Sequence, residues 1–510
     1  MKKTILSAVI GLLMTGLSLA QNDLGKVRAW RQAHEHHILA EYFEFLSIPN
    51  FALDKDNIRK NAEFIAGLLE KRGLESRLLP AQTPGAPPAV YAEVLAPGAE
   101  RTIVFYAHYD GQAVNPAQWH PSIKPFEPVF LSDSLAKGGR VLPQPGPGEA
   151  IDPEWRVSGR SSSDDKAGVM LILNAWNALA ESHIQPTSNI KFFFEGEEEI
   201  GSVHLGEILE NHPELLRSDL WIIADGPVHQ SGLPMLDFGV RGDVNMEITV
   251  YGPRRPLHSG HYGNWAPNPA LLLAKLLASM KDDDGRVTIK GFYDDIVPFS
   301  AEEKKAIADM PAVDESLKRE LGFIRPEGGG KTLYELYGYP SLNINGMRSA
   351  DVGKDARNVI PAEAAATLDL RQVLGTDFRK QAQRVIDHIR AQGFYVTERD
   401  PTDEERVRYE KIAKVTIDEG GYNAQRTPLN LPVSRSVIAA VQRAAGGPIV
   451  VAPTSGGSLP LYLIEERLGA KVISLGIANY DNNQHAENEN VRIRNLWDGL
   501  EQLAAIMVME

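Results

Sequence analysis

Residues 189–202 read NIKFFFEGEEEIGS, and this stretch indicates both the fold and the chemistry. An apolar run such as Phe192–Phe194 is typical of a strand buried on both faces of a parallel sheet. The strand leads directly into three adjacent glutamates, Glu197, Glu198 and Glu199. Carboxylates this close repel one another unless a cation or a proton is present. The stretch therefore predicts a buried strand that ends in metal-binding or proton-transferring groups, the alternative being a solvated acidic run.

Similar strands recur along the chain. TIVFYAH at 102–108, LWIIADG at 220–226 and AKVISLGI at 470–477 are also predominantly apolar. Segments with helical periodicity alternate with them, after two helices predicted at 27–47 and 56–72. This alternation predicts an α/β fold with a mostly parallel, twisted sheet and helices on both faces.

The pattern changes after Gly242. VNMEITVYG at 244–252 alternates as a strand, and PNPALLLAKLLASM at 267–280 is predicted to be helical. AAATLDLRQVL, a helix at about 377–392 and the strand-like KIAKVTID follow. This order resembles a β-α-β-β-α-β unit, which predicts a separate α+β domain with an antiparallel sheet.

The predicted domain limits follow from these changes. Residues 1–20 form a signal peptide, 21–240 and 421–510 form the two parts of one α/β domain, and 241–420 form the inserted domain. The Pro- and Gly-rich stretch from 111 to about 154 is predicted to be a long surface excursion and not a core element. A second stretch, at about 282–340 in the inserted domain, is also polar and rich in Pro and Gly.

The N-terminus predicts export. Lys2 and Lys3 precede an apolar run from Ile5 to Leu19, and small residues end at Ala20. This pattern is typical of a secretory signal peptide cleaved after Ala20, the alternative being a membrane anchor. The expected location is periplasmic or extracellular, with no membrane association after cleavage.

Charge and cysteine content exclude some functions. The 510 residues carry 53 Lys and Arg against 67 Asp and Glu, a net charge of −14, or −16 once the two lysines of the signal peptide are removed. Such an acidic chain repels nucleic acid, so no nucleic-acid partner is expected. Because the chain has no cysteine, any metal must take His and carboxylate ligands.

Several such ligands lie at the ends of predicted strands. In α/β sheets, bound groups collect at the carboxyl ends of the strands. Two imidazoles, several carboxylates and a spare glutamate are the groups that a two-metal hydrolase requires. Alone, each has a simpler explanation, such as a chance H-x-D pair or a helix N-cap. The candidate residues are His108, Asp110, Asp164, Glu198, Glu199, Asp225 and His485.

At this point the chain resembles a known family. It is similar to the di-zinc exopeptidases that include carnosinases, glutamate carboxypeptidase, aminoacylase and the acetylornithine and succinyl-diaminopimelate deacylases, and most of all to the carnosinase and dipeptidase branch. The matching segments occur in the family's order across almost the whole mature chain. They are FYAHYDGQ, GRSSSDDKAG, FFFEGEEEIGS, ADG, PLHSGHYG, NVIPAEAAATLDLRQV, TSGGSLP and QHAENE.

The resemblance implies a pair of zinc ions, with manganese or cobalt as alternatives. His108, Asp164 and Asp225 would hold one ion. Asp164, Glu199 and His485 would hold the other, so that Asp164 bridges the two. The family also implies a cis peptide bond directly after Asp164.

The resemblance assigns further roles. Asp110 would orient His108, and Glu198 would be the general base. His258 would come from the inserted domain of a partner subunit and polarise the scissile carbonyl. Asn358 and Arg371 would bind the terminal carboxylate or carbonyl of the substrate.

A glycine turn departs from the family pattern. Gly456, Gly457 and Ser458 would line the substrate pocket. Relatives in this branch carry R-E-G-G-S there, whereas this chain has Thr454-Ser455 before the glycines. Carnosine-like specificity is therefore not implied.

These features together predict an exported metallopeptidase that hydrolyses the amide bond of dipeptides or short peptides. The inserted domain would act as a lid and hold a homodimer together. The alternatives are an N-acyl amino acid deacylase on the same fold and, from another class, a non-catalytic solute-binding protein, which would not need Glu198.

Overall fold

The structure is a computed structural model that describes the backbone of residues 2–457 and 459–510. Within these ranges the side chains of residues 2–22 are not described. The side chains of the predicted signal peptide and the whole of Ser458 therefore lie outside the described residues. No helix in the described part is both long and apolar enough to cross a membrane.

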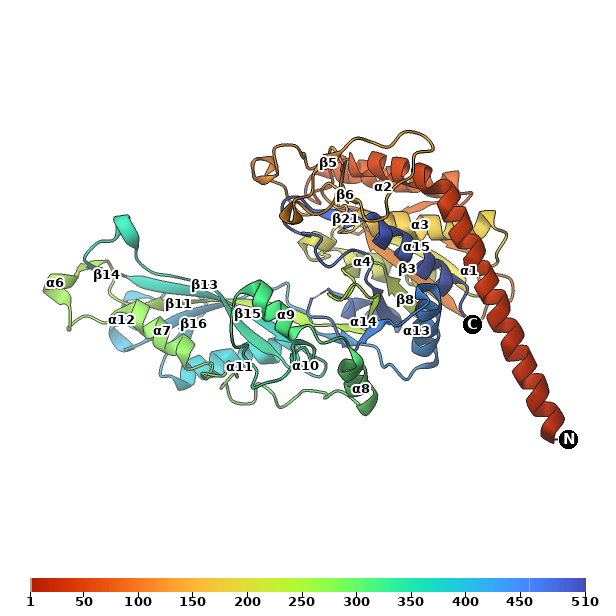
Figure 1. The fold of residues 1–510 in the computed structure, drawn as a ribbon. Coiled ribbons are helices and arrows are strands. Elements are labelled where there is room, and N and C mark those ends of the chain that lie inside the picture. The colour runs from red at the N-terminus through yellow and green to blue at the C-terminus, as the bar shows by residue number, and fades with distance from the viewer. Residues whose placement is uncertain (1, 458) are drawn as a thin grey trace.

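An eight-stranded sheet forms the centre of what we call the large lobe (Figure 1). The strand β7 (Asn189–Glu195), which contains the three phenylalanines, pairs in parallel with β3 and antiparallel with β2. Parallel pairing continues from β3 to β8 and from β8 to β20. The other strands, in their order around β7, are β1 (Arg77–Leu79), β2 (Ala89–Val94), β3 (Thr102–His108), β8 (Leu220–Ile223), β20 (Lys471–Leu475), β9 (Met235–Asp237) and β19 (Val450–Ala452).

Helices cover both faces of this sheet. Phe192 and Phe194 share one core cluster with residues of five helices, and Phe193 shares another with residues of three. Because both faces are covered, the strand is a continuous apolar run. The first face carries α1 (Lys2–Leu46), α2 (Lys55–Lys71), α3 (Lys166–Glu181), α13 (Pro432–Ala445) and α15 (Ile493–Met507), and the second carries α4 (Leu205–Asn211), the short α5 (Pro213–Leu216) and α14 (Tyr462–Leu468).

A five-stranded sheet forms the small lobe. It is antiparallel except where β16 pairs with β17. A second core lies between this sheet and the helices α7 (Pro269–Ala278) and α11 (Phe378–Ala391). The strands run in the order β13 (Ser341–Arg348), β15 (Glu363–Gln372), β11 (Gly242–Tyr251), β17 (Ile412–Ile417) and β16 (Tyr395–Thr397).

The remaining elements are short. At the far end of the small lobe, β12 pairs with β14, and β10 pairs with β18 near the junction of the lobes. These short elements are α5 (Pro213–Leu216), β10 (Gly239–Val240), β12 (Leu257–His258), α6 (Ser259–Tyr262), β14 (Val359–Ile360), α12 (Asp403–Arg408) and β18 (Gln425–Arg426).

The first Pro- and Gly-rich stretch is more structured than the sequence predicts. Residues 111–154 contribute β4 (Val129–Leu131) and β5 (Val141–Leu142) to a four-stranded sheet with β6 (Arg156–Ser158) and β21 (Asn490–Arg492). Trp119, Ile123 and Leu131 form a small core of their own. These strands could not be predicted from the sequence, because two or three residues are too few to show a strand periodicity among many turn-forming residues.

The second Pro- and Gly-rich stretch contains helices that its composition does not reveal. It contains α8 (Ala301–Asp309), α9 (Asp314–Leu321) and α10 (Leu333–Leu336). Val313 and Tyr334 pack against Met235 and Val450 of the large sheet. This part of the predicted inserted domain therefore packs against the large lobe.

The predicted fold class is confirmed: a mostly parallel sheet with flanking helices and a separate antiparallel sheet. Strands of the large sheet come from before residue 240 and after residue 449, and strands of the small lobe lie between. The domain limits at 20, 240 and 420 stay predictions.

Candidate active site

Distant parts of the chain place six side chains at one edge of the large sheet. His108 ends β3, and Asp225 follows β8 by two residues. Glu198 and Glu199 begin a 3-10 helix after β7. Asp164 lies just before α3, and His485 lies in the loop between β20 and β21. The carboxyl ends of parallel strands meet at the same edge, which is why these residues converge.

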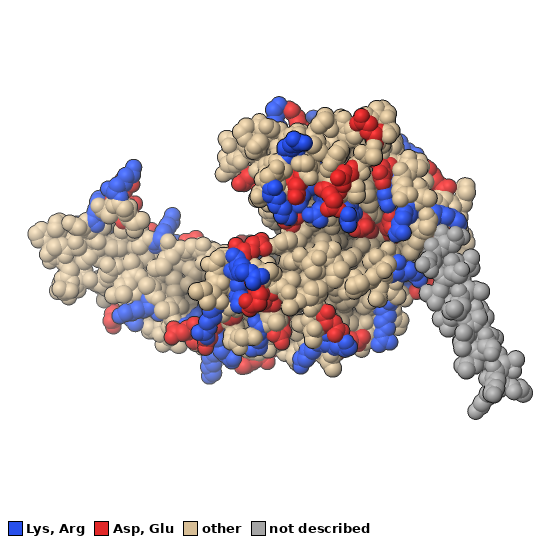
Figure 2. Space-filling model, in the orientation of Figure 1, with Lys and Arg blue, Asp and Glu red and all other residues tan. Residues whose placement is uncertain are grey.

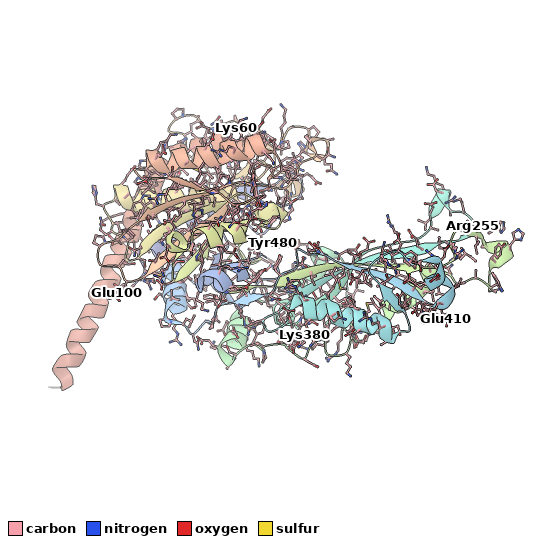
Figure 3. All side chains as sticks on the ribbon, turned by 180° about the vertical axis from the view of Figure 1, so that it is seen from behind. Lys60, Glu100, Arg255, Lys380, Glu410 and Tyr480 are labelled. Atoms are coloured by element: carbon pink, nitrogen blue, oxygen red, sulfur yellow. The ribbon has the colours of Figure 1, made fainter. Side chains whose placement is uncertain are left out.

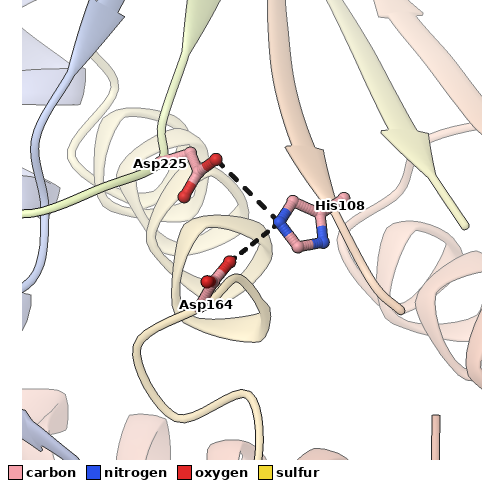
Figure 4. Close-up of side chains that lie close together, drawn as sticks. All are labelled: His108, Asp164 and Asp225. Atoms are coloured by element: carbon pink, nitrogen blue, oxygen red, sulfur yellow. Dashed lines mark hydrogen bonds and ion pairs between the residues drawn. The ribbon is translucent and has the colours of Figure 1, made fainter. Parts of the chain in front are cut away.

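The first triad is formed by His108, Asp164 and Asp225. Each offers one ligand atom, and these atoms lie within 4.8 Å of one another. His108 Nε2 lies 3.0 Å from Asp164 Oδ1 and 3.9 Å from Asp225 Oδ2 (Figure 4). The triad can therefore hold a metal ion.

The second triad is formed by Asp164, Glu199 and His485, again within 4.8 Å. His485 Nε2 lies 3.1 Å from Asp164 Oδ2 and 3.2 Å from Glu199 Oε2. Gln112 donates to Glu199 Oε2 over 2.9 Å. Asp164 belongs to both triads and offers a different oxygen to each, as a bridging ligand must.

The electrostatics of the cluster suit cations. Burial raises the pKa of Asp225 to about 7, and the charge of Asp164 adds to the shift. Burial likewise raises the pKa of Glu198 well above its usual range, with Asp225 and Glu199 contributing. Ionised carboxylates in a buried place are unfavourable without compensating positive charge. The imidazole and carboxylate donors, shared through one aspartate, fit a pair of divalent cations.

Asp110 organises the first triad and the glutamates together. Its Oδ1 lies 3.3 Å from His108 Nδ1, on the side of the ring away from Asp164. Its two oxygens accept hydrogen bonds from the backbone N–H groups of Glu198 and Glu199 over 3.1 and 3.0 Å. One buried carboxylate therefore fixes the imidazole and the glutamate-bearing turn at the same time.

The loop that carries Asp164 is held by Glu489, which the sequence analysis did not single out. The fully buried Glu489 carboxylate accepts hydrogen bonds from the backbone N–H groups of Ser161, Ser163 and Asp164. It also pairs with Arg160 Nη1 over 2.6 Å. The peptide bond after Asp164 is cis, as the resemblance implies. The only sequence signal was the acid's position four residues after His485, which does not reveal the backbone it binds.

We expect Glu489→Gln to lower the free energy of unfolding by about 3 kcal/mol, because the buried Arg160 loses its charged partner. Urea denaturation of the metal-loaded protein measures the change. Glu487→Gln is the matched control, since Glu487 is exposed, and it should shift stability by less than about 0.5 kcal/mol. Equal effects of the two variants would contradict the role of Glu489.

The structure does not bring every predicted residue to this cluster. His258 and Asn358 are exposed and neighbour each other through the β12–β14 pair at the far end of the small lobe. Arg255, close by in the chain, marks that end in Figure 3, and Tyr480 marks the cluster side. Within a single chain the two residues therefore lie apart from the cluster.

Arg371 lies on β15 at the base of the small lobe. Its Nε is 3.0 Å from Asp369 Oδ1 and 3.7 Å from Asp243 Oδ1. The guanidinium is thus already engaged with carboxylates of its own sheet.

A cleft of about 480 Å³ opens at the cluster. Its lining includes Asp164, Glu198 and His485 as well as Gly456 and Gly457 of the predicted turn. The other wall comes from the second Pro- and Gly-rich stretch and carries the missed residues Tyr334 and Tyr337. Figure 2 shows a wide hollow between the large lobe and the far end of the small lobe. The cleft is large enough for a small ligand.

Comparisons with known proteins agree with this geometry. The model described as peptidase family M20/M25/M40 matches residues 104–508. The Cys-Gly metallodipeptidase DUG1 of Saccharomyces cerevisiae is 26% identical over 91% of this chain and 93% of its own length. The human β-Ala-His dipeptidase is 24% identical over 83% of this chain and 77% of its own.

A solved structure is similar as well. The M20 family metallo-carboxypeptidase Sso-CP2 from Sulfolobus solfataricus matches with a TM-score of 0.75 and 28% identity, covering 92% of this chain and 98% of that one. The resemblance predicted from the sequence, including the carnosinase and dipeptidase branch, is confirmed.

The predicted periplasmic or extracellular location is wrong. The yeast Cys-Gly dipeptidase, which aligns over nearly its whole length, is a cytosolic enzyme. An apolar N-terminal run after two lysines was thus insufficient ground for export, and we do not propose it.

Proposed function

The chain belongs to peptidase family M20/M25/M40, and from this premise we propose that it is a di-zinc dipeptidase with Glu198 as its general base. Hydrolysis of peptide bonds by a metallopeptidase follows from the family and its dipeptidase relatives. The observation that carries the finer proposal is that Asp164 is shared by two triads beside Glu198, which belongs to neither.

Two ions would be held by the two triads. His108 and Asp225 complete the site on one side of Asp164, and Glu199 and His485 complete it on the other. Imidazole and carboxylate ligands without thiolates favour zinc, with manganese and cobalt as alternatives. When bound, such a pair lowers the pKa of a water molecule and polarises the substrate carbonyl.

Glu198 is placed to move protons. Its Oε2 lies 3.7 Å from His108 Nε2, its side chain is 13% exposed, and it lines the cleft. We assign it two steps: it takes the proton of the attacking water, and it then delivers a proton to the leaving amine. Its neighbour Glu197 points elsewhere, with Oε2 2.8 Å from His204 Nδ1.

His258 would reach the cleft of a second subunit in a homodimer. The outer strand of the small lobe, β13, has one edge that pairs with no other strand of the described residues, and it exposes Ile344 and Met347. Leu271 of α7 is exposed as well. Unpaired strand edges and exposed apolar residues are features of association surfaces. In such a dimer His258 would stabilise the developing oxyanion in the partner's cleft.

The substrate would be a dipeptide with its carboxylate bound on the side of the small lobe. Arg371 would donate to that carboxylate from the same chain, and Asn358, which lies beside His258, would donate to it only across the dimer, in the cleft of the second subunit. The turn at Gly456 and Gly457 would let the substrate backbone approach closely. A side chain at Gly456 would lie within 2.7 Å of the Tyr337 ring, so the turn has no room for one.

Metal analysis combined with a substrate screen tests this function. We expect about two divalent ions per chain and hydrolysis of dipeptides such as Ala-Ala. Chelation should remove the ions and abolish the hydrolysis. N-acetyl and N-succinyl amino acids form the second arm of the screen. Cleavage of these compounds without cleavage of dipeptides would establish a deacylase instead, and metal-independent hydrolysis would reject both.

A further inference from the structure

Asp237 is a cleft residue to which neither the sequence analysis nor the proposed mechanism assigns a role. It ends β9, where it pairs with Ser474 of β20 and Ala452 of β19. Its neighbours Leu236 and Phe238 point into the main core and are fully buried. Asp237 therefore faces the opposite side of the sheet, together with Met235, and both line the cleft.

The Asp237 carboxylate lacks a compensating group within the described part of the chain. Its Oδ1 is shielded from solvent and has no hydrogen-bond partner there. No ion pair of Asp237 occurs among the described residues. Burial alone raises the pKa of Asp237 to about 7. An unpaired buried polar atom is costly and needs an explanation.

Two tyrosines, Tyr334 and Tyr337, line the same cleft as this carboxylate. Burial raises the pKa values of Tyr334 and Tyr337, and the charge of Asp237 adds to both shifts, which places the two rings near it. The Tyr334 hydroxyl donates its hydrogen bond to Gln230 Oε1 over 3.1 Å and not to Asp237. The nearby cation Arg241 donates to Ser341 Oγ. A carboxylate that shares a cleft with two tyrosine rings is a suitable environment for an organic ammonium group.

The position of Asp237 links it to the reaction. The same cleft is lined by Asp164, Glu198 and His485. A dipeptide carries a protonated amino group two bonds from its scissile carbonyl carbon, whereas an N-acyl amino acid carries none. An unacylated dipeptide would therefore supply the missing positive charge, and an acylated substrate would leave the carboxylate unpaired.

We propose that Asp237 binds the ammonium group of the substrate and so selects dipeptides with a free amino terminus over N-acylated compounds. The inference rests on the proposed dipeptidase function and narrows its substrate class. An ammonium group could also come from a lysine side chain in the first residue, so the test separates the two sources.

The experiment compares the wild-type enzyme with Asp237→Asn on three substrates: Ala-Ala, N-acetyl-Ala-Ala and Nα-acetyl-Lys-Ala. We expect the wild type to prefer Ala-Ala over N-acetyl-Ala-Ala by about 100-fold in kcat/KM. Asp237→Asn should lose about that factor on Ala-Ala, mainly through a higher KM, and leave N-acetyl-Ala-Ala nearly unchanged. If Nα-acetyl-Lys-Ala behaves like Ala-Ala, the side-chain ammonium is the bound group.

Stability and metal content separate recognition from structure. Removing an unpaired buried charge should leave Tm equal or higher, whereas a structural role for Asp237 would lower it. Should Asp237→Asn fail to fold, Asp237→Ser serves the same comparison. Equal losses on Ala-Ala and N-acetyl-Ala-Ala, or an unchanged preference, would overturn the assignment of Asp237. A metal-loaded wild type that cleaves neither compound would instead overturn the proposed dipeptidase function.

Discussion

Glu198→Gln should reduce kcat for Ala-Ala by about 10³-fold while the enzyme keeps its metal. The amide has the size of the carboxylate but cannot accept a proton from water, and general-base catalysis contributes about 10²- to 10⁴-fold. Because Glu198 belongs to neither triad, both ions should remain. Steady-state kinetics and elemental analysis of the same preparation measure the two quantities.

Glu197→Gln is the matched control for this variant. Glu197 is next in the chain and carries the same side chain, but its carboxylate contacts His204 outside the cluster. We expect its kcat to change by less than about threefold. If Glu197→Gln were as inactive as Glu198→Gln, or if Glu198→Gln lost its metal, Glu198 would not be the general base.

Two inactive variants should restore activity when they are combined in one dimer. His258→Ala and Glu198→Gln each disable both sites of a homodimer. In the mixed dimer, the His258→Ala subunit keeps Glu198 and receives His258 from its partner, so one of two sites is complete. Co-expression with two different affinity tags yields the mixed dimer, which should show about half of the wild-type activity.

The mixed dimer tests the role of His258 because His258 is exposed and lies away from the cluster of its own chain. His258 lies at the far end of the small lobe, away from its own cluster (Figure 1). A mixed dimer without activity would show that His258 does not act across subunits. A wild-type enzyme that sediments as a fully active monomer would reject the homodimer itself.

The residues of the two triads could be found from the sequence because their local patterns are strong. A strand buried on both faces must be apolar, so the acids directly after Phe194 and the imidazole that ends TIVFYAH were conspicuous. The order of these segments gave the family, and the family gave the pairing of ligands. The same local reasoning failed at the N-terminus, where an apolar run after two lysines predicts export.

Other parts of the site left no local pattern. The walls of the cleft come from a Pro- and Gly-rich stretch in which α10 has only four residues. Tyr334 and Tyr337 became visible only when this stretch folded back onto β9 and β19. Glu489 and Asp237 are two of many acids in the sequence, and no local pattern marks either of them.

Sequence alone therefore determined which strands are buried and which chemical groups end them, because burial imposes composition residue by residue. Only the tertiary structure decided which of those groups meet. Asp164 serves two triads, Glu489 holds the Asp164 loop, and Asp237 faces the cleft without a partner because segments hundreds of residues apart pack together. Such contacts depend on the path of the whole chain, which no short stretch of sequence specifies.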